Sequence, residues 1–431
     1  MRPATQWRVG DSFDVEVGDV AHGGHCVARH EGRVLFVRHT APGERVTARI
    51  TGIGKGGRFV QADAVQVLRP GEQRRPAPCP YAGPGGCGGC DFQHLTPVAQ
   101  RALKTRVVHE QFARLAGLDL TAELGQTRCE PLPEPEEAAD SAEEGLGWRT
   151  RVEFAVTEGG VPGLRRHRSR DIVPVSDCLI AHPALRAPDV LARRYPGSDA
   201  VDVVVADSGR AVVPVPTDAS PSVTETVRLP GGPASFSVAA RGFWQVHPAA
   251  AQVLVEEVLE MVQPRAGERA LDLYSGVGLF AAALAEAVGP AGRVTAVESE
   301  PAAVEHGRAN LAPWPQARMR AGRVDRVLRE LRPARGRRSR RPVDLVVLDP
   351  PRVGAGAAVI ADVSTLRPRV IAYVACDPAA LARDTASLLS LGWRLRGLRV
   401  LDAFPMTHHV ECVAHFEPVR ETGTTREHRI S

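Results

Sequence analysis

Residues 343–378 decide the fold: VDLVVLDPPR opens this stretch, a mostly apolar segment follows, and VIAYVACDP closes it. Each end is a short apolar run, rich in β-branched residues, that stops abruptly at polar residues and proline. This pattern is typical of buried parallel strands. Ligands of open α/β sheets bind outside the carboxyl ends of such strands. We therefore expect Asp349 and Cys376, which follow the two runs, to lie at one site.

A glycine-rich turn upstream of these strands predicts a nucleotide-type cofactor. The stretch ERALDLYSGVGLF at 268–280 precedes a helical run and then GRVTAVESE, which together predict strand, turn, helix and strand. Gly276 and Gly278 allow close approach of a ligand, and Glu298 is spaced to take ribose hydroxyls. The turn also fits the dinucleotide fingerprint, so a nicotinamide dehydrogenase is an alternative. The acid Asp272 before the turn and the late position of this unit favour S-adenosylmethionine.

Cys376 is the candidate nucleophile, because it ends a strand and a predicted helix begins just beyond Asp377. The positive end of the helix dipole is expected to favour the thiolate. The alternative is a small buried thiol, and we assign that role to Cys26, Cys129 and Cys412.

Two further segments supply polar candidates. Glu411, between Val410 and Cys412 at the start of the last predicted strand, is an acid in an apolar setting, as a general base requires. The preceding His408 and His409 fit ordinary loop residues equally well. Gln245, in FWQVHP, is placed to hydrogen-bond either a cofactor or the backbone.

Three cysteines lie close together in CPYAGPGGCGGC: Cys79, Cys87 and Cys90. Glycine and proline allow a chain to wrap around an ion or cluster and leave amides free to reach sulfur. We expect the fourth thiolate from Cys178, whose segment predicts ordered structure, rather than from Cys129. An iron–sulfur cluster and Zn²⁺ both suit four thiolates, and the residues alone leave both open.

The pattern of the whole chain predicts an α/β multidomain protein. Residues 1–70 carry short alternating runs between glycine turns, typical of a small β-barrel. That barrel is either a generic β-domain or a nucleic-acid-binding one. Residues 71–250 predict a central α+β domain, with a helix at about 96–116. Strand–helix alternation over 251–419 predicts a doubly wound, Rossmann-like domain, and 420–431 a flexible tail. The basic residues available to a nucleic-acid-binding barrel are Arg29, His30, Arg33, Arg38 and Lys55.

The insertion at 130–144 has seven acids and no base, so we expect it to be disordered. The arginine-rich run at 332–341 predicts a solvated loop. Better candidates for contacts to a nucleic-acid backbone are the central-domain arginines Arg165, Arg166, Arg168 and Arg170.

The composition is that of a soluble protein, with 43% hydrophobic and 24% charged residues and a formal charge of +4. That mild charge does not by itself demand a nucleic-acid partner. The N-terminus lacks the apolar core of a signal peptide, and no run reaches the roughly 18 apolar residues of a membrane span. We therefore expect a cytoplasmic protein with no membrane contact, and no obligatory protein partner is evident. In a reducing compartment its eight cysteines are expected to be ligands, catalysts or buried thiols.

Taken in order, seven motifs resemble those of the RNA 5-methyluridine methyltransferase family, and the resemblance covers nearly the whole chain. The motifs are CPYAGPGGCGGC, GFWQV, LDLYSGVGLF, VESE, VLDPPR, YVACDPAALARD and FPMTHHVECV. The resemblance implies a TRAM barrel that binds RNA, a central domain with a [4Fe–4S] cluster and a C-terminal methyltransferase domain. It implies S-adenosylmethionine-dependent methylation of uracil carbon 5 in tRNA or rRNA.

The resemblance also implies residue roles. Cys376 would add to carbon 6 of the uracil, and Glu411 would remove the carbon 5 proton from a base that has been flipped or splayed out. S-adenosylmethionine would be bound in the glycine turn, with Gly276 and Gly278, and by four side chains: Gln245, Tyr274, Glu298 and Asp349. The cluster would be held by Cys79, Cys87, Cys90 and Cys178.

Three departures from the family pattern stand out. Seven residues separate the first two cluster cysteines, where five are more common, so that loop must bulge. His247 and Leu279 stand where asparagine is frequent. Two other functions also fit. Methylation of another base on this scaffold is disfavoured because Arg352, not an aromatic residue, follows the double proline. An RNA-binding or iron–sulfur module without catalysis is disfavoured because Cys376 and Glu411 are both present.

Overall fold

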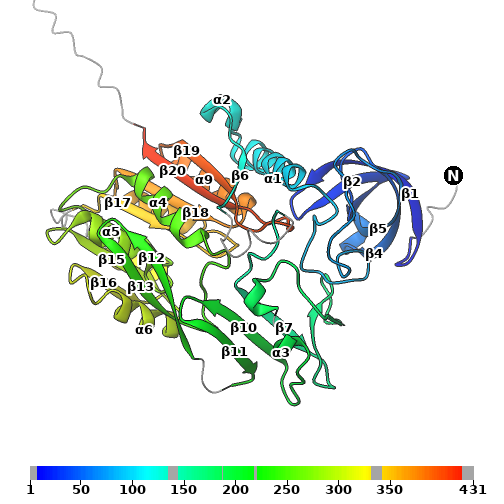
Figure 1. The fold of residues 1–431 in the computed structure, drawn as a ribbon. Coiled ribbons are helices and arrows are strands. Elements are labelled where there is room, and N and C mark those ends of the chain that lie inside the picture. The colour runs from blue at the N-terminus through cyan, green and yellow to red at the C-terminus, as the bar shows by residue number, and fades with distance from the viewer. Residues whose placement is uncertain (1–6, 134–143, 187, 218–220, 332–341, 420–431) are drawn as a thin grey trace, which may run out of the picture.

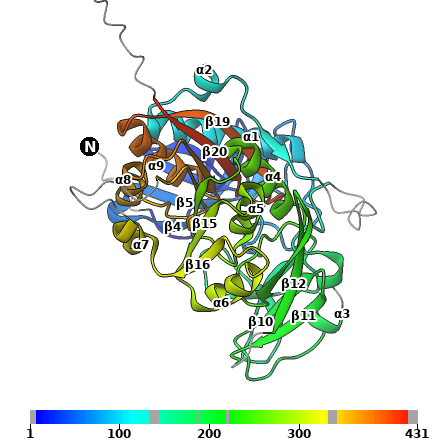
Figure 2. The same ribbon diagram turned by 90° about the vertical axis from the view of Figure 1, so that its left-hand side faces the viewer.

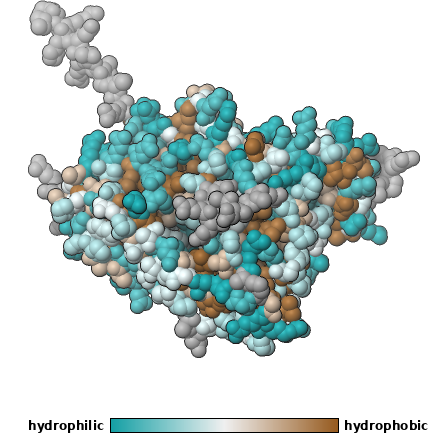
Figure 3. Space-filling model, viewed as in Figure 1, coloured by the Kyte–Doolittle hydropathy of each residue, from teal (hydrophilic) through white to brown (hydrophobic). Residues whose placement is uncertain are grey.

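The computed structural model of the protein describes residues 7–133, 144–186, 188–217, 221–331 and 342–419. The predicted tail, the arginine-rich run at 332–341 and most of the acidic insertion lie outside the described residues. Figure 1 shows the β-barrel at one end of the molecule, the large C-terminal sheet at the other and a smaller sheet below them. Polar side chains cover much of the face in Figure 3, and apolar ones gather in several patches.

The N-terminal strands form the predicted closed barrel, in the order β1-β2-β3-β5-β4. Inward positions alternate with outward ones: Leu35 and Val37 of β3 are fully buried, whereas Phe36 between them is partly exposed. This period of two is what a half-buried strand requires. The barrel strands are β1 Ser12–Ala21, β2 His25–His30, β3 Arg33–Arg38, β4 Arg45–Ile53 and β5 Phe59–Arg69, with a 3₁₀ turn at Lys55–Gly57.

The central region is an α+β arrangement around a five-stranded antiparallel sheet ordered β11-β10-β7-β8-β9. A separate ribbon, β12 and β13, leads into the C-terminal region. The strands are β7 Arg151–Val156, β8 Pro162–Arg165, β9 Ile172–Pro174, β10 Ala200–Ala206, β11 Gly209–Val215, β12 Ser222–Leu229 and β13 Gly232–Ala239. Short helical turns lie at Pro183–Leu185 and at α3, Pro188–Leu191.

The C-terminal sheet is the predicted doubly wound one, ordered β16-β15-β14-β17-β18-β20-β19-β6. The two runs that decided the fold are β17 and β18, which are parallel neighbours with every residue buried. The glycine turn lies between β14 and α5, as expected. The strands are β14 Arg269–Leu273, β15 Arg293–Glu298, β16 Ala317–Ala321, β17 Leu345–Leu348, β18 Val370–Ala375, β19 Trp393–Asp402, β20 Glu411–Pro418 and β6 Cys129–Pro131.

Helices cover both faces of this sheet (Figure 2). One apolar core contains α4 and α5, and a second contains α8, α9 and the start of α7. Burial on both faces explains why the sheet strands are continuous apolar runs. The helices are α4 Ala250–Val262, α5 Leu279–Val288, α6 Pro301–Asn310, α7 Val324–Leu331, α8 Ala357–Thr365 and α9 Pro378–Ser390.

The segment after the cysteine loop joins the C-terminal sheet although it is far away in sequence. Helix α1, Pro97–Gln111, ends in a π-helical turn at Phe112–Ala116, and α2 follows at Leu120–Leu124. Val108 and Phe112 pack in the same core as α9. Strand β6 then adds to β19 in parallel, with Cys129 opposite Val400. The C-terminal sheet and its core are therefore built partly from residues 108–131.

Among the described residues, no helix is both long and apolar enough to cross a membrane.

Candidate active site

A cavity of about 1180 Å³ opens at the carboxyl ends of the C-terminal strands. Seven of the residues predicted from the sequence to form the site line this cavity, although they come from six separate segments of the chain. Gly278 is the one predicted cofactor residue that does not line it. The seven are Gln245, Tyr274, Gly276, Glu298, Asp349, Cys376 and Glu411.

Cys376 and Glu411 face each other across two paired strands. Strands β18 and β20 are antiparallel, with Ala375 opposite Cys412. One step further in this register places Cys376 opposite Glu411. Side chains at directly opposed positions have β-carbons about 4.5–5.5 Å apart, so one small ring can contact both groups.

The expectation that a helix end would favour the Cys376 thiolate is wrong for the ligand-free protein. Burial raises the pKa of the Cys376 thiol to about 11, and the carboxyl groups of Glu411 and Asp349 act in the same direction. The amides at the start of α9 are occupied instead by Asp377, whose Oδ1 accepts a hydrogen bond from the Ala380 N–H at 2.7 Å. The thiol is therefore protonated near neutrality.

Two of the carboxyl groups that line the cavity, those of Glu411 and Asp349, have raised pKa values and so favour their neutral forms. Glu411 is 4% exposed, and burial, followed by the nearby Asp349, raises its pKa well above the ordinary value. Burial likewise raises the pKa of Asp349 to about 7. Arg352 opposes the shift at Glu411. A cationic ligand in this cavity would be stabilised by these carboxylates, because opposite charge favours their ionised form.

The glycine turn presents backbone amides and a pre-organised carboxylate. Gly276 has a φ of +52°, and its N–H donates to Glu298 Oε2 at 3.0 Å. The other oxygen, Oε1, accepts from the amides of Ser299 and Glu300. The Ser299 hydroxyl also donates to Oε1, at 3.4 Å. Glu298 is thus fixed, and Oε2 keeps a lone pair for a hydroxyl donor. Gly278, with a φ of +92°, instead supports packing, because a β-carbon there would lie 3.3 Å from Leu311.

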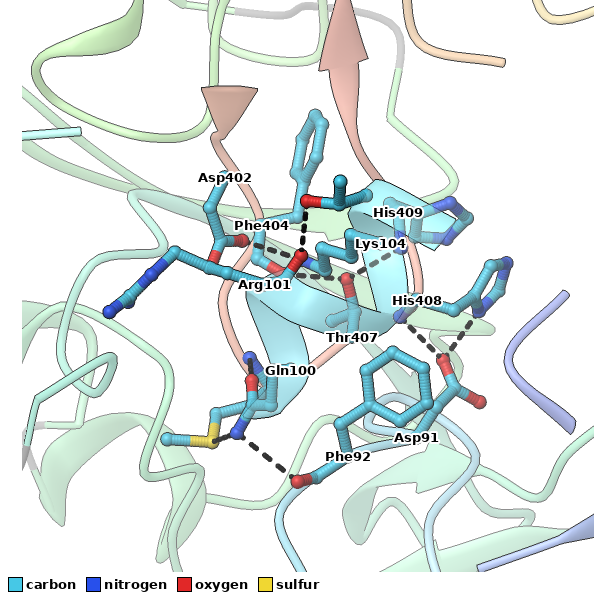
Figure 4. Close-up of polar contacts among 12 residues, drawn as sticks. Asp91, Phe92, Gln100, Arg101, Lys104, Asp402, Phe404, Thr407, His408 and His409 are labelled. Carbon is cyan, nitrogen blue, oxygen red and sulfur yellow. Dashed lines mark hydrogen bonds and ion pairs between the residues drawn. The ribbon is translucent and has the colours of Figure 1, made fainter. Parts of the chain in front are cut away.

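The loop that delivers Glu411 is held by the start of α1 (Figure 4). Lys104 Nζ donates to Asp402 Oδ1 at 2.5 Å and to the Phe404 carbonyl at 3.0 Å. Gln100 Oε1 accepts from the Met406 N–H at 2.8 Å. Sequence reasoning missed these contacts. The available signal was that Lys104 is one of only two lysines among 54 basic residues.

Next along the same loop, His408 is bound to the segment after the cysteine loop. Its N–H and its Nδ1 both contact Asp91 Oδ2, at 3.1 and 2.5 Å. Arg38 of the barrel lies 3.2 Å from the other Asp91 oxygen. Arg38 is therefore a buried structural cation, not an exposed nucleic-acid contact. His22 of the barrel meets Asp377, beside the candidate nucleophile, at 3.0 Å.

Replacing Lys104 with methionine is expected to lower the free energy of unfolding by about 3–5 kcal/mol. The change leaves Asp402 charged, buried and unpaired, which is the costly way to break a buried pair. Denaturant unfolding followed by circular dichroism measures the loss. The matched control is Arg101→Met on the same helix, whose partner Glu144 is exposed, so about 0–1 kcal/mol is expected there. Equal losses in the two variants would contradict this account.

The four candidate cluster cysteines line a second cavity of about 330 Å³. The Gln93 amide donates to Cys90 Sγ at 3.2 Å, and the Gly89 N–H to Cys87 Sγ at 3.3 Å. Burial raises the pKa of the Cys178 thiol to about 11, and Cys87 adds to the shift. Burial also raises the pKa values of the Cys79, Cys87 and Cys90 thiols. Within the described ranges, however, no three His, Cys, Asp or Glu side chains converge as a single-ion site.

The longer spacing between the first two cysteines is accommodated by tight turns. The Ala82 N–H donates to the Cys79 carbonyl, and the Cys87 N–H returns to the Tyr81 carbonyl. A β-carbon at Gly86 would lie 2.2 Å from Tyr81 O. The predicted bulge is thus a glycine-dependent turn.

The remaining candidates divide between buried and surface positions. Cys26, Cys129 and Cys412 are buried, as expected. His247 is buried and stacks on Trp148, with 5.9 Å between the ring centroids, so it does not line the large cavity. Leu279 does line that cavity. The predicted backbone contacts Arg165, Arg166 and Arg168 surround the cysteine cavity.

Known proteins resemble this chain along its whole length. A family described as tRNA (Uracil-5-)-methyltransferase matches residues 219–418, and the TRAM domain matches residues 6–62. A Streptomyces coelicolor protein described as an uncharacterized RNA methyltransferase is 47% identical, covering 95% of this chain and 93% of its own. A 23S rRNA (uracil(1939)-C(5))-methyltransferase of Pseudomonas fluorescens is 32% identical, covering 96% of each. The chain belongs to the RNA uracil-C5 methyltransferase family.

A solved structure shares the fold across all three regions. The Pyrococcus abyssi tRNA (uracil-54, C5)-methyltransferase in complex with S-adenosyl-L-homocysteine superimposes with a TM-score of 0.64 at 20% identity, covering 94% of this chain and 99% of its own. The matched family and the rRNA-modifying relative show that this RNA methyltransferase is an S-adenosylmethionine-dependent enzyme that acts on uracil carbon 5 of RNA, not a dehydrogenase. The N-terminal barrel is a TRAM domain.

Proposed function

We propose that the enzyme methylates uracil carbon 5 through a covalent bond between Cys376 and carbon 6 of the base. One observation carries this proposal: the register of β18 and β20 sets Cys376 opposite Glu411, in the cavity that also contains the glycine turn. Nucleophile, base and cofactor elements then surround one ring.

The proposed chemistry balances on these two residues. The Cys376 thiol first loses its proton to solvent. The resulting thiolate bonds to carbon 6, and the electron pair of the carbon 5–carbon 6 double bond moves toward carbon 5 and oxygen 4. S-adenosylmethionine, when bound, supplies an electrophilic methyl group to carbon 5. Glu411 then takes the carbon 5 proton, the carbon–hydrogen electron pair re-forms the double bond, and the Cys376 thiolate leaves. The apolar setting of Glu411 makes it a stronger base than a solvated carboxylate.

We assign the methyl donor to the residues around the glycine turn. Glu298 is positioned for the ribose hydroxyls, and Gly276 for close backbone approach. Asp349 and Gln245 line the same cavity as the turn and Cys376, and their polar groups suit the amino-acid part and the charged sulfur. Tyr274, at the end of β14, completes the adenosine side. The positive charge on the sulfur of the methyl donor would favour the ionised form of the Asp349 carboxyl group.

Methylation of unmodified transcripts by the purified chain tests the function. We propose structured RNA, tRNA or rRNA, as substrate, and 23S rRNA comes first because the more similar of the two named enzymes acts on it. Nucleoside mass spectrometry should find 5-methyluridine in one RNA class, and RNA from cells with and without the gene should agree. A different methylated base would reveal another specificity. Binding without any product would support the module that lacks catalysis.

We further propose that Cys79, Cys87, Cys90 and Cys178 hold a [4Fe–4S] cluster. A tetrahedral Zn²⁺ site has Zn–S bonds of about 2.3 Å, which requires the four sulfur atoms to lie about 3.8 Å from one another. The four thiols line one cavity of about 330 Å³, which has room for the larger group. Amides aimed at the Cys87 and Cys90 sulfurs are typical partners of cluster thiolates. The cluster would tie the cysteine loop to Cys178 in the central domain.

Cys90→Ser is expected to lose the iron and acid-labile sulfide that the wild-type protein, purified without oxygen, should contain in equal amounts. Serine replaces a soft thiolate with a hard hydroxyl, which disfavours iron–sulfur ligation. Chemical analysis of both elements measures the loss. Cys129→Ser, another buried cysteine outside the cavity, is the control that should retain them. Zinc in place of iron in the wild type would refute the cluster.

A further inference from the structure

We propose that the outer face of the barrel carries an aromatic track, His25, Phe36 and Phe59, that stacks the unpaired RNA bases flanking the target uridine. This inference rests on the proposed function, because it concerns how the same RNA reaches the same cavity. The occupant is single-stranded RNA, and the track contains one ring from each of three neighbouring strands.

The alternation of the strands sets all three rings on the outer face. Cys26 in β2, Leu35 in β3 and Val60 in β5 are buried inside the barrel. Each track residue directly precedes or follows one of these inward positions, so its side chain points outward. Phe59 is 38% exposed, and His25 and Phe36 are partly exposed. Strands β2, β3 and β5 are adjacent in the barrel.

The three rings form a continuous row. The His25 and Phe36 centroids are 5.2 Å apart, and those of Phe36 and Phe59 are 5.8 Å apart, both edge to face. Phe59 in turn covers Gly54, where a β-carbon would lie 2.5 Å from the ring. The lack of a side chain at Gly54 leaves room for the far edge of the Phe59 ring against the turn. Exposed rings in a row are the platform on which successive bases stack without sequence preference.

At its His25 end the row lies beside the turn that meets the loop leading to Glu411. The β1–β2 turn contacts the catalytic loop, because a β-carbon at Gly24 would lie 2.6 Å from His408 Cβ. The His408 and His409 rings are 4.1 Å apart, and His409 lies 6.0 Å from Phe404. Phe404 lines the cavity with Cys376. A second set of rings, His408, His409 and Phe404, therefore lies between the β1–β2 turn and the cavity that contains Cys376.

The charges along the track suit a polyanion. Lys55 and Arg58 are exposed in the turn that carries Phe59. At the other end, burial and then Arg168 lower the pKa of His25 to about 4. His25 is therefore a neutral ring at physiological pH and stacks as an aromatic group. Exposed cations at the Phe59 end and neutral rings along the row match a strand whose phosphates and bases alternate.

The chemistry of the reaction explains why the occupant should be unpaired. A uracil that enters the cavity must leave its helix, and proteins read RNA sequence in loops and bulges whose bases can be splayed out. The neighbouring bases then lose their stacking partners, and a row of rings beside the cavity replaces them. Double-stranded RNA would offer no bases to this face.

The test compares Phe59→Leu with Phe59→Trp in the full-length enzyme. Leucine keeps an apolar side chain but removes the ring, so KM for RNA should rise at least about five-fold with kcat unchanged. Phe59→Trp keeps an aromatic ring, so its KM should equal that of the wild type. A short single-stranded oligouridylate should quench the fluorescence of the new tryptophan. Leu391→Ala, an exposed apolar residue after α9, is the matched control and should leave KM unchanged. Lys55→Gln should lower the salt dependence of binding, whereas Phe59→Leu should not.

Wild-type KM in Phe59→Leu, with active wild-type enzyme, would overturn the track and leave the proposed function intact. Loss of kcat instead of a rise in KM would also overturn it, because the ring would then act on folding or catalysis. Absence of product from the wild type would refute the proposed function. In that case quenching of the Phe59→Trp fluorescence by oligouridylate would still report the stacking separately.

Discussion

Cys376→Ala is expected to abolish the formation of 5-methyluridine, with a fall in rate of at least about 10⁴-fold, the scale seen when an enzyme loses its nucleophile. Without the sulfur nothing adds to carbon 6, and carbon 5 of uracil is too weak a nucleophile to take the methyl group. The same variant should form no covalent complex with RNA that contains 5-fluorouridine, which the wild type should trap. Denaturing gel electrophoresis of labelled RNA and nucleoside mass spectrometry measure the two effects.

The matched control is Cys412→Ala. This thiol is adjacent to Glu411 in sequence but is fully buried on the opposite face of β20, so the variant should keep both adduct and product. A Cys376→Ala protein that still methylates uracil would refute the covalent route. Because burial raises the pKa of the thiol to about 11, the reactive thiolate increases with pH. The kcat/KM of the wild type should therefore rise across the neutral range.

The sequence predicted the catalytic sheet because its strands are simple to recognise. Strands β17 and β18 are uninterrupted apolar runs, and each is buried along its whole length. Their parallel pairing puts Asp349 and Cys376 at one edge of the sheet. The glycine turn and Glu298 could be predicted for a similar reason, because the strand, turn, helix and second strand follow one another directly in the sequence.

Other features depend on contacts that no local pattern contains. Residues Cys129–Pro131 form an edge strand of the C-terminal sheet, yet they lie more than 250 residues before its partner β19. The Lys104–Asp402 pair is equally remote. The state of Cys376 was also mispredicted, because a helix N-terminus is a local feature, whereas the burial and the two carboxyl groups that oppose it come from distant strands.

The second large effect is expected from Glu411→Gln. Glutamine keeps the size and polarity of the side chain but cannot accept a proton, so the step after methyl transfer should slow by about 10²- to 10⁴-fold. The bond between Cys376 and carbon 6 breaks only when the carbon 5 proton leaves. This variant should therefore accumulate a covalent complex with ordinary RNA and S-adenosylmethionine, the opposite of Cys376→Ala.

The contrast between the two variants assigns their roles. If Glu411 instead only activated the thiol, Glu411→Gln would form less adduct, not more. Asp402→Asn, which alters the other end of the loop that carries Glu411, separates position from chemistry: a misplaced loop should weaken adduct formation and release together. Accumulation of methylated adduct in Glu411→Gln alone would show that the carboxylate opposite Cys376 is the base, because only a missing proton acceptor stops the reaction after the methyl group has been transferred.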